Sequence, residues 1–120
     1  MILSAATCLA LTVYFEARSE SYDAQLAVAE VVINRRDSER WPDTICDVAF
    51  QRKQFSAFNH GIPTVRNQTA WAVAQSVADD ALCGYTLGHG ATHYHTVAVA
   101  PYWADDLELV GRYGAHVFYR

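Results

Sequence analysis

Residues 9–20 read Leu-Ala-Leu-Thr-Val-Tyr-Phe-Glu-Ala-Arg-Ser-Glu, an apolar run that closes on two glutamates. Apolar side chains before and within this run recur every three or four residues, as they do on one buried face of a helix. They are Leu3, Ala6, Ala10, Val13, Tyr14 and Ala17. This spacing predicts a helix over residues 3–18, which places Glu16 near the carboxyl end of that helix.

Three more helices are expected downstream. Residues 19–23 interrupt the apolar pattern and offer serine and aspartate caps, after which residues 24–36 form a strongly apolar segment that predicts a deeply buried helix. Asp43 or Thr44 could begin a short helix that runs through Phe50. Asn67 is a typical cap for a longer helix, and Gly84 is its natural stop.

The texture of the sequence changes after residue 90. Residues 92–97 and 116–119 are rich in aromatic and β-branched side chains, which favour strands. Helices that come first and strands that come last indicate an α+β fold rather than a parallel α/β fold. We therefore expect one mainly helical domain over residues 1–120, with a small antiparallel β-sheet in its C-terminal third.

Composition excludes several classes of protein. The 120 residues are 52% hydrophobic and 18% charged, and no apolar run reaches the about 20 residues that a membrane span requires. One lysine and eight arginines are scattered through a chain of net charge -4, so neither nucleic acid binding nor membrane insertion is expected. The apolar start lacks a basic residue, and we interpret it as mature structure rather than as a signal peptide. We expect a monomer.

Three cysteines, Cys8, Cys46 and Cys83, lack the spacing of a metal site. One disulfide is compatible with them, and an odd number leaves at least one free thiol in a monomer. The sequence does not pair them, and none has the neighbours of a cysteine–histidine enzyme.

Glu16 is the residue whose neighbours point most directly to chemistry. Val13, Tyr14 and Phe15 would remove water from its carboxyl group and so raise its pKa. A carboxyl that stays protonated near neutral pH can act as the acid of glycoside cleavage. The alternative is a salt bridge to Arg18 or Arg35, which the spacing alone favours.

Most glycosidases use two carboxyl groups, and Glu20 and Glu30 are the candidates for a second. Glu20 follows Glu16 by four residues but falls in the expected turn, where a solvated or capping role is common. Glu30 lies within the second predicted helix and would otherwise pair with Arg35 or Arg36.

Four histidines gather in the C-terminal third of the chain: His89, His93, His95 and His116. With a third ligand, His93 and His95 could hold zinc on one strand face, but the cluster contains no carboxylate. Tyr94 and Trp103 nearby favour a cleft of aromatic and polar side chains that binds sugar, and we expect no metal and no cofactor. Strand alternation places Tyr94 on the face opposite His93 and His95.

A loop over residues 51–61 mixes amides, a hydroxyl and aromatic rings before Pro63. Gln54 and Phe55 are its candidates for contacts with sugar hydroxyl and acetamido groups. The alternative is a surface loop that Phe55 and Phe58 pin to the core. Ser56 lacks the neighbours of a catalytic nucleophile.

These motifs together resemble the SleB/CwlJ-type cell wall hydrolases, a family that includes spore cortex-lytic enzymes. The resemblance begins with residues 9–20 and with Gln-Leu-Ala-Val-Ala-Glu-Val-Val-Ile-Asn-Arg at residues 25–35. It continues, in order, at residues 44–48, 54–56, 91–95, 101–104 and 116–119. One departure is Ser19, where the family usually has glycine.

The resemblance implies a lysozyme-like, lytic-transglycosylase-like fold that cleaves the bond between N-acetylmuramic acid and N-acetylglucosamine in peptidoglycan, with Glu16 as the essential acid. It leaves a two-carboxylate muramidase and a silent glycan-binding module as alternatives. We expect the glycan strand to meet a set of seven residues: Glu20, Gln54, Phe55, Tyr94, His95, Trp103 and His116. The site of action would be the bacterial cell wall. Because no signal peptide is recognised, we expect either phage- or holin-type delivery, as for an endolysin, or a sequence that has been trimmed.

Overall fold

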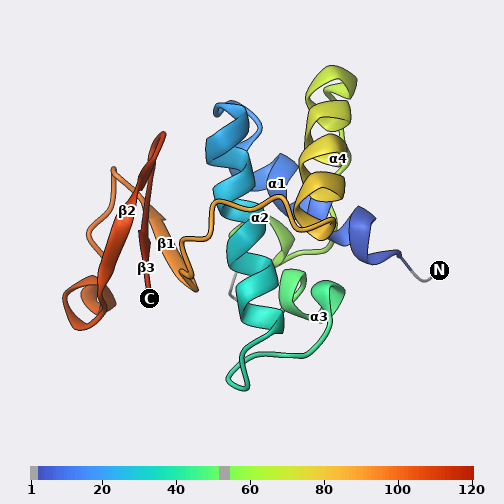
Figure 1. Cartoon of the computed structure of the whole chain (residues 1–120). Coiled ribbons are helices and arrows are strands. Elements are labelled where there is room, and N and C mark those ends of the chain that lie inside the picture. The colour runs from blue at the N-terminus through green and yellow to red at the C-terminus, as the bar shows by residue number, and fades with distance from the viewer. Residues whose placement is uncertain (1–2, 52–54) are drawn as a thin grey trace.

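The computed structural model describes residues 3–51 and 55–120 (Figure 1). Within these ranges the α-helices are α1 (Ala5–Ala17), α2 (Tyr22–Arg36), α3 (Ile45–Ala49) and α4 (Gln68–Leu82). Its three strands are β1 (His93–Thr96), β2 (Leu109–Tyr113) and β3 (His116–Tyr119), and two 3-10 turns span Ser56–Phe58 and Tyr102–Asp106. The predicted α+β fold, mainly helical with a C-terminal antiparallel sheet, is confirmed.

A polar side chain caps the start of each α-helix. Ser4, Ser21, Thr44 and Asn67 each accept a hydrogen bond from the backbone N–H three residues later, at 3.0–3.2 Å. The cap at Ser21 starts α2 two residues earlier than the apolar pattern predicted. At the other end of α4, Gly84 follows the helix with a left-handed φ of 96°, so the predicted stop is confirmed.

The core lies where α1 and α2 pack against each other and against α4. Every residue from Cys8 to Tyr14 in α1 and from Ala24 to Val32 in α2 is buried, which is wider than the single apolar face expected for α1. Helix α1 is buried on more than one face because it contacts α2, α3 and α4. Figure 1 shows α2 in the middle, with the sheet on one side and α1 and α4 on the other. No helix in the described ranges is long and apolar enough to span a membrane.

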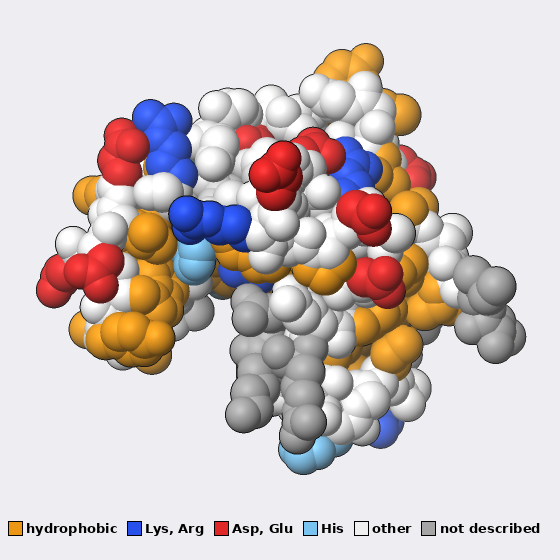
Figure 2. Space-filling view, turned by 90° about the horizontal axis from the view of Figure 1, so that it is seen from below, with side chains coloured by type: hydrophobic (Ala, Val, Ile, Leu, Met, Phe, Trp, Pro, Cys, Tyr) orange, Lys and Arg blue, Asp and Glu red, His pale blue; other side chains and the backbone are white. Residues whose placement is uncertain are grey.

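The sheet is antiparallel in the order β1-β3-β2. Its inner face places Phe118 against Val28 and Val31 of α2, in a second cluster of buried side chains. Strand β2 was not predicted, because its sequence Leu-Val-Gly-Arg-Tyr contains a glycine and its register shifts between Leu109 and Gly111. Seen from below, the molecule carries acidic and basic side chains side by side around the end formed by the α2–α3 loop (Figure 2).

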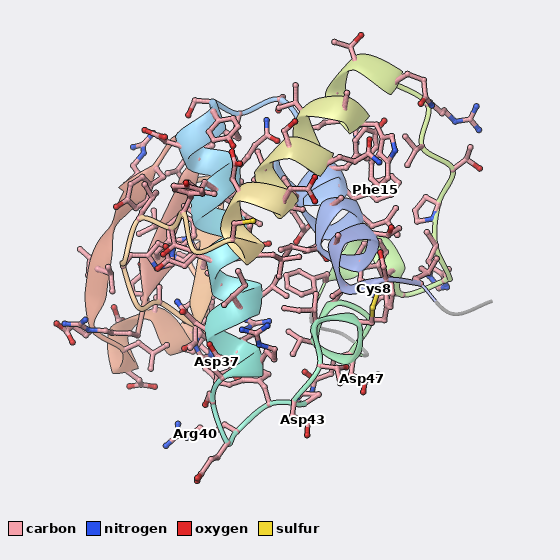
Figure 3. All side chains as sticks on the ribbon, turned by 45° about the vertical axis from the view of Figure 1, so that its right-hand side comes forward. Cys8, Phe15, Asp37, Arg40, Asp43 and Asp47 are labelled. Carbon is pink, nitrogen blue, oxygen red and sulfur yellow. A yellow bond between two sulfur atoms is a disulfide. The ribbon has the colours of Figure 1, made fainter. Side chains whose placement is uncertain are left out.

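A disulfide joins Cys8 of α1 to Cys46 of α3, with the two Cα atoms 5.2 Å apart (Figure 3). Cys83 is exposed and free. This assigns the pairing that the sequence left open. The bridge closes a loop over a sequence separation of 38 residues. Chain-entropy arguments give such a loop a stabilising effect of about 4 kcal/mol.

We predict that reducing this bridge lowers the free energy of unfolding by about 2–4 kcal/mol, because the reduced chain regains the entropy of the open loop. The measurement is urea unfolding of the oxidised and reduced forms of a Cys83→Ser variant, which removes the exposed thiol and any exchange through it. Equal midpoints for the two forms, or three titratable thiols in wild-type protein purified without reductant, would contradict the pairing.

Candidate active site

Glu16 lies in the last turn of α1, where its half-buried carboxyl group meets the sheet. The hydroxyl of Tyr94 in β1 donates a hydrogen bond of 2.8 Å to Oε1 of Glu16. Burial raises the pKa of Glu16 above its ordinary value, while the Tyr94 hydrogen bond and the charge of Arg35 offset part of that rise. The sequence-based expectation of a desolvated carboxyl with a raised pKa is therefore confirmed.

Tyr94 is held by aromatic rings on several sides. Its ring centroid lies 5.5 Å from that of Phe118, 6.5 Å from Phe55 and 5.1 Å from His116. Burial, followed by the nearby Glu16 carboxylate, raises the pKa of Tyr94 well above its ordinary value. The phenol therefore keeps its proton and remains a donor to Glu16. Phe55 is 2% exposed and His116 is 4% exposed, so both pack against Tyr94 in the interior, and their predicted contacts with sugar stay predictions.

Arg35, in the last turn of α2, brings positive charge to the same place. Its Nε donates to the carbonyl oxygen of Thr92 at 2.7 Å. Its guanidinium carbon lies 5.3 Å from the ring centroid of Trp41 and 5.4 Å from that of Phe55. Arg18, the other arginine considered as a partner for Glu16, instead lies over the ring of Tyr14 at 5.0 Å. The charge that acts on Glu16 is thus that of Arg35.

The opposite face of β1 carries His93 and His95, as strand alternation predicted. His95 Nδ1 lies 2.7 Å from the carbonyl oxygen of Thr96, so it carries the proton, and Nε2 accepts from the hydroxyl of Tyr119 at 2.8 Å. Trp103 packs against both histidines, with ring centroids 5.3 Å from His93 and 5.7 Å from His95. Tyr94, which contacts Glu16, and His116 therefore share the inner face, whereas His95 and Trp103 lie on the outer face.

The four histidines do not converge. His89 lies against α2, where Nε2 donates to the carbonyl oxygen of Ala27 at 2.9 Å and Nδ1 accepts from the N–H of Ala91 at 2.8 Å. Both ring nitrogens of His89 are thereby engaged by backbone. Within residues 3–51 and 55–120, no three histidine, cysteine or acidic side chains are placed to share a metal ion.

Glu20 joins the corner between α1 and α2 to the β2–β3 hairpin. Its Oε1 accepts a hydrogen bond of 3.1 Å from the N–H of Ala115 and lies 3.7 Å from Nδ1 of His116. A side chain on Gly114, whose φ is 60°, would place Cβ 2.4 Å from Oε2 of Glu20 and 3.2 Å from Cβ of Ala24, so this turn favours glycine. Burial lowers the pKa of His116, although the charge of Glu20 opposes that shift.

Glu30 does not pair with Arg35 or Arg36, and this expectation was wrong. Its carboxylate accepts backbone hydrogen bonds from Leu87, Gly88 and Gly90, at 2.7, 2.9 and 3.2 Å. The left-handed φ values of 72° and 69° at Gly88 and Gly90 let the loop turn these N–H groups toward one buried carboxylate. Arg36 pairs with Asp37 instead, at 2.9 Å.

Three site residues remain: Gln54, and Arg35 and Trp41, whose roles were not predicted from the sequence. Gln54 lies outside the described residues. Phe55 and Phe58 both pack into the core cluster, as the alternative interpretation of their loop expected. The sequence suggested Arg35 only as an ion-pair partner and gave no role to Trp41. The one signal for Trp41 is a large aromatic residue in an otherwise polar loop between two helices.

We predict that Tyr94→Phe raises the pKa of Glu16 further. The hydrogen bond from Tyr94 stabilises the ionised carboxylate, and the variant lacks it. The Glu16 carboxyl carbon, followed by NMR across a pH titration, gives this pKa directly. Tyr119→Phe is the matched control, since it removes a tyrosine hydroxyl that bonds to His95 on the other face. A pKa of Glu16 that stays constant or falls in Tyr94→Phe would show that the hydrogen bond does not act on this group.

Comparison with known proteins shows which family this chain is similar to. Residues 19–119 match the family described as Cell Wall Hydrolase, a match that begins just after Glu16. Spore cortex-lytic enzymes of Halalkalibacterium halodurans and Bacillus subtilis are 36% and 34% identical to this chain, and each alignment covers 92% of it. The alignments cover 33% and 35% of those two proteins, so the chain spans about a third of their length.

Solved structures extend the likeness to the whole chain, Glu16 included. The catalytic domain of the germination-specific lytic transglycosylase SleB from Bacillus anthracis superimposes with a TM-score of 0.84 at 28% identity, over 100% of this chain and 97% of that one. The catalytic domain of the Bacillus cereus SleB protein gives a TM-score of 0.77 at 28% identity, over 97% and 89% of the two chains. The chain belongs to the cell wall hydrolase family and has the lysozyme-like fold of the SleB catalytic domains.

Proposed function

We propose that this protein is a peptidoglycan lytic transglycosylase that cleaves the β-1,4 bond between N-acetylmuramic acid and N-acetylglucosamine, with Glu16 as its acid and base. The observation that carries the proposal is the state of Glu16, a half-buried carboxyl with a raised pKa and one oxygen held by Tyr94. The likeness to the Bacillus anthracis SleB domain, which is a lytic transglycosylase, supports the same reaction.

The hydrogen bond from Tyr94 determines which oxygen of the Glu16 carboxyl group donates the proton. Because Tyr94 donates to Oε1, the proton of the neutral carboxyl sits on Oε2, where it can be given to the oxygen of the scissile bond. That transfer leaves a carboxylate beside the positive charge of Arg35, which favours the ionised form. The acid is therefore protonated before cleavage and its anion is stabilised afterwards.

In the second half of the reaction, the Glu16 carboxylate takes the proton of the muramyl 6-hydroxyl as that oxygen attacks C1. The bond from C1 to the leaving oxygen breaks and a bond from C1 to O6 forms, so no water is consumed and the product ends in a 1,6-anhydromuramyl group. Attack within one sugar replaces an oriented water, which removes the need for a second carboxylate. The contacts of Glu20 and Glu30 support a mechanism with one carboxyl group, since each of these carboxylates accepts backbone hydrogen bonds.

The substrate is a glycan strand of the bacterial cell wall, and the protein acts on it as a monomer. His95 and Trp103 offer it a half-buried surface of aromatic and polar groups. Tyr94, which packs against Phe55 and His116, holds the catalytic carboxyl. Glu20 lends negative charge beside the site, and Gln54 remains a predicted contact for sugar hydroxyls. Delivery by a phage or holin system also stays a prediction.

We predict that Glu16→Gln loses lytic activity by about 10²–10⁴-fold, because the amide is nearly isosteric but cannot give up and recover a proton. Clearing of a peptidoglycan suspension measures the activity, and thermal unfolding checks that the variant is folded. The matched variant Glu20→Gln should lose activity only in part, because its amide oxygen can still accept from Ala115.

Two results would contradict this assignment. Substantial lysis by a folded Glu16→Gln protein would remove Glu16 from the reaction. A Glu20→Gln protein as inactive as Glu16→Gln would instead favour hydrolysis by two carboxyl groups.

A further inference from the structure

A hollow lies at the loop that joins α2 to α3. It has a volume of about 520 Å³ and is lined by residues 36–39 and 41–43. Figure 3 shows Asp37, Arg40 and Asp43 spaced along this loop at the edge of the molecule. The loop lies outside every contact that the proposed reaction uses, yet one of its lining residues, Trp41, connects it to the active site.

Trp41 contacts two residues at or near the active site, Arg35 and His93. Its ring is approached by the guanidinium of Arg35, at 5.3 Å, and by the ring of His93, with centroids 5.5 Å apart. Arg35 acts on Glu16, and His93 packs in turn against Trp103 at 5.3 Å. The rings of Trp103, His93 and Trp41 thus form a continuous row from the outer face of β1 to the hollow.

The groups around the hollow suit a sugar ring. A pyranose presents a weakly apolar face to an aromatic side chain and a rim of hydroxyl groups to polar ones. Trp41 provides the ring, and Glu39 and Asp43 are exposed carboxylates that can accept from hydroxyl groups. The Ser38 oxygen accepts from the N–H of Arg40 at 3.3 Å, which leaves its own proton free to donate.

The row of rings also indicates where such a sugar would come from. A polysaccharide cleaved at Glu16 must leave the site along the surface, and successive sugars need successive platforms. We propose that the hollow beside Trp41 is a distal subsite for one N-acetylated hexosamine of the same glycan strand. This inference rests on the proposed function, because it takes the glycan at Glu16 as its starting point.

The test uses Glu16→Gln protein, which should bind without cleaving, and N-acetylglucosamine oligomers from the disaccharide to the hexasaccharide. We expect affinity to rise with length, and Trp41→Ala to weaken hexasaccharide binding about three- to tenfold, a larger loss than it causes for the disaccharide. Glu39→Gln with Asp43→Asn should weaken the hexasaccharide in the same direction. Because Glu39 and Asp43 are exposed, this pair also tests the subsite if Trp41→Ala folds poorly.

Two controls make the readout specific. Asp23→Asn with Asp79→Asn removes the same charge from exposed positions that do not line the hollow, and it should not change affinity. In NMR spectra the indole signal of Trp41 should move with the hexasaccharide, whereas that of Trp71, which packs against Tyr14 in the core cluster, should not.

The outcomes separate the two proposals. Hexasaccharide affinity that stays within twofold of the parent in both hollow variants would overturn the subsite and leave the reaction at Glu16 standing. No binding of any oligomer by the parent would overturn the subsite and glycan recognition together. Lysis of peptidoglycan by the wild-type protein tests the reaction separately from either result.

Discussion

The hydrogen bond from Tyr94 to Glu16 joins the two halves of this molecule at the point where the chemistry is proposed. Glu16 belongs to the helices and Tyr94 to the sheet, with a sequence separation of 78 residues. The bond exists only if the sheet is fixed against α2, and side chains of the helical half do that by binding backbone. Glu30 holds the loop at residues 87–90, Asn34 and Arg35 hold the carbonyls of Ala91 and Thr92, and Glu20 holds the hairpin at Ala115.

This arrangement has a cost that follows from the raised pKa of Glu16. A carboxyl whose pKa is higher in the folded chain than in the unfolded chain binds its proton more tightly when folded. Its contribution to stability is therefore fully present below the unfolded pKa and is lost as pH rises through the folded pKa. At neutral pH, burial of Glu16 therefore lowers the free energy of unfolding. The packing of α1 against α2 offsets this loss.

The helices could be predicted from the sequence because their signals are local. Apolar spacing located α1 and α2, and caps such as Asn67 and the stop at Gly84 set the ends of α4. Glu16 was identified for the same reason, since its desolvating neighbours are its sequence neighbours. The contacts of Glu20 and Glu30 were not predictable, because their partners lie 95 and 57 or more residues away and are backbone groups without a residue signature. Strand β2 was missed although its partner β3 is close in sequence, because Gly111 interrupts its strand pattern. The role of Trp41 was missed because His93, the ring that it contacts, lies in the distant strand β1.

The central claim is that one carboxyl, held by Tyr94 and backed by Arg35, suffices for cleavage of the glycan strand. Mass spectrometry of peptidoglycan digested by the purified protein tests it most directly, because the two possible ends of the product differ by one water. Muramyl products that all end in the 1,6-anhydro form, one water lighter than a reducing end, are the expected result. Reducing muramyl ends as the main product would contradict the claim, since they require an activated water and a second group to place it.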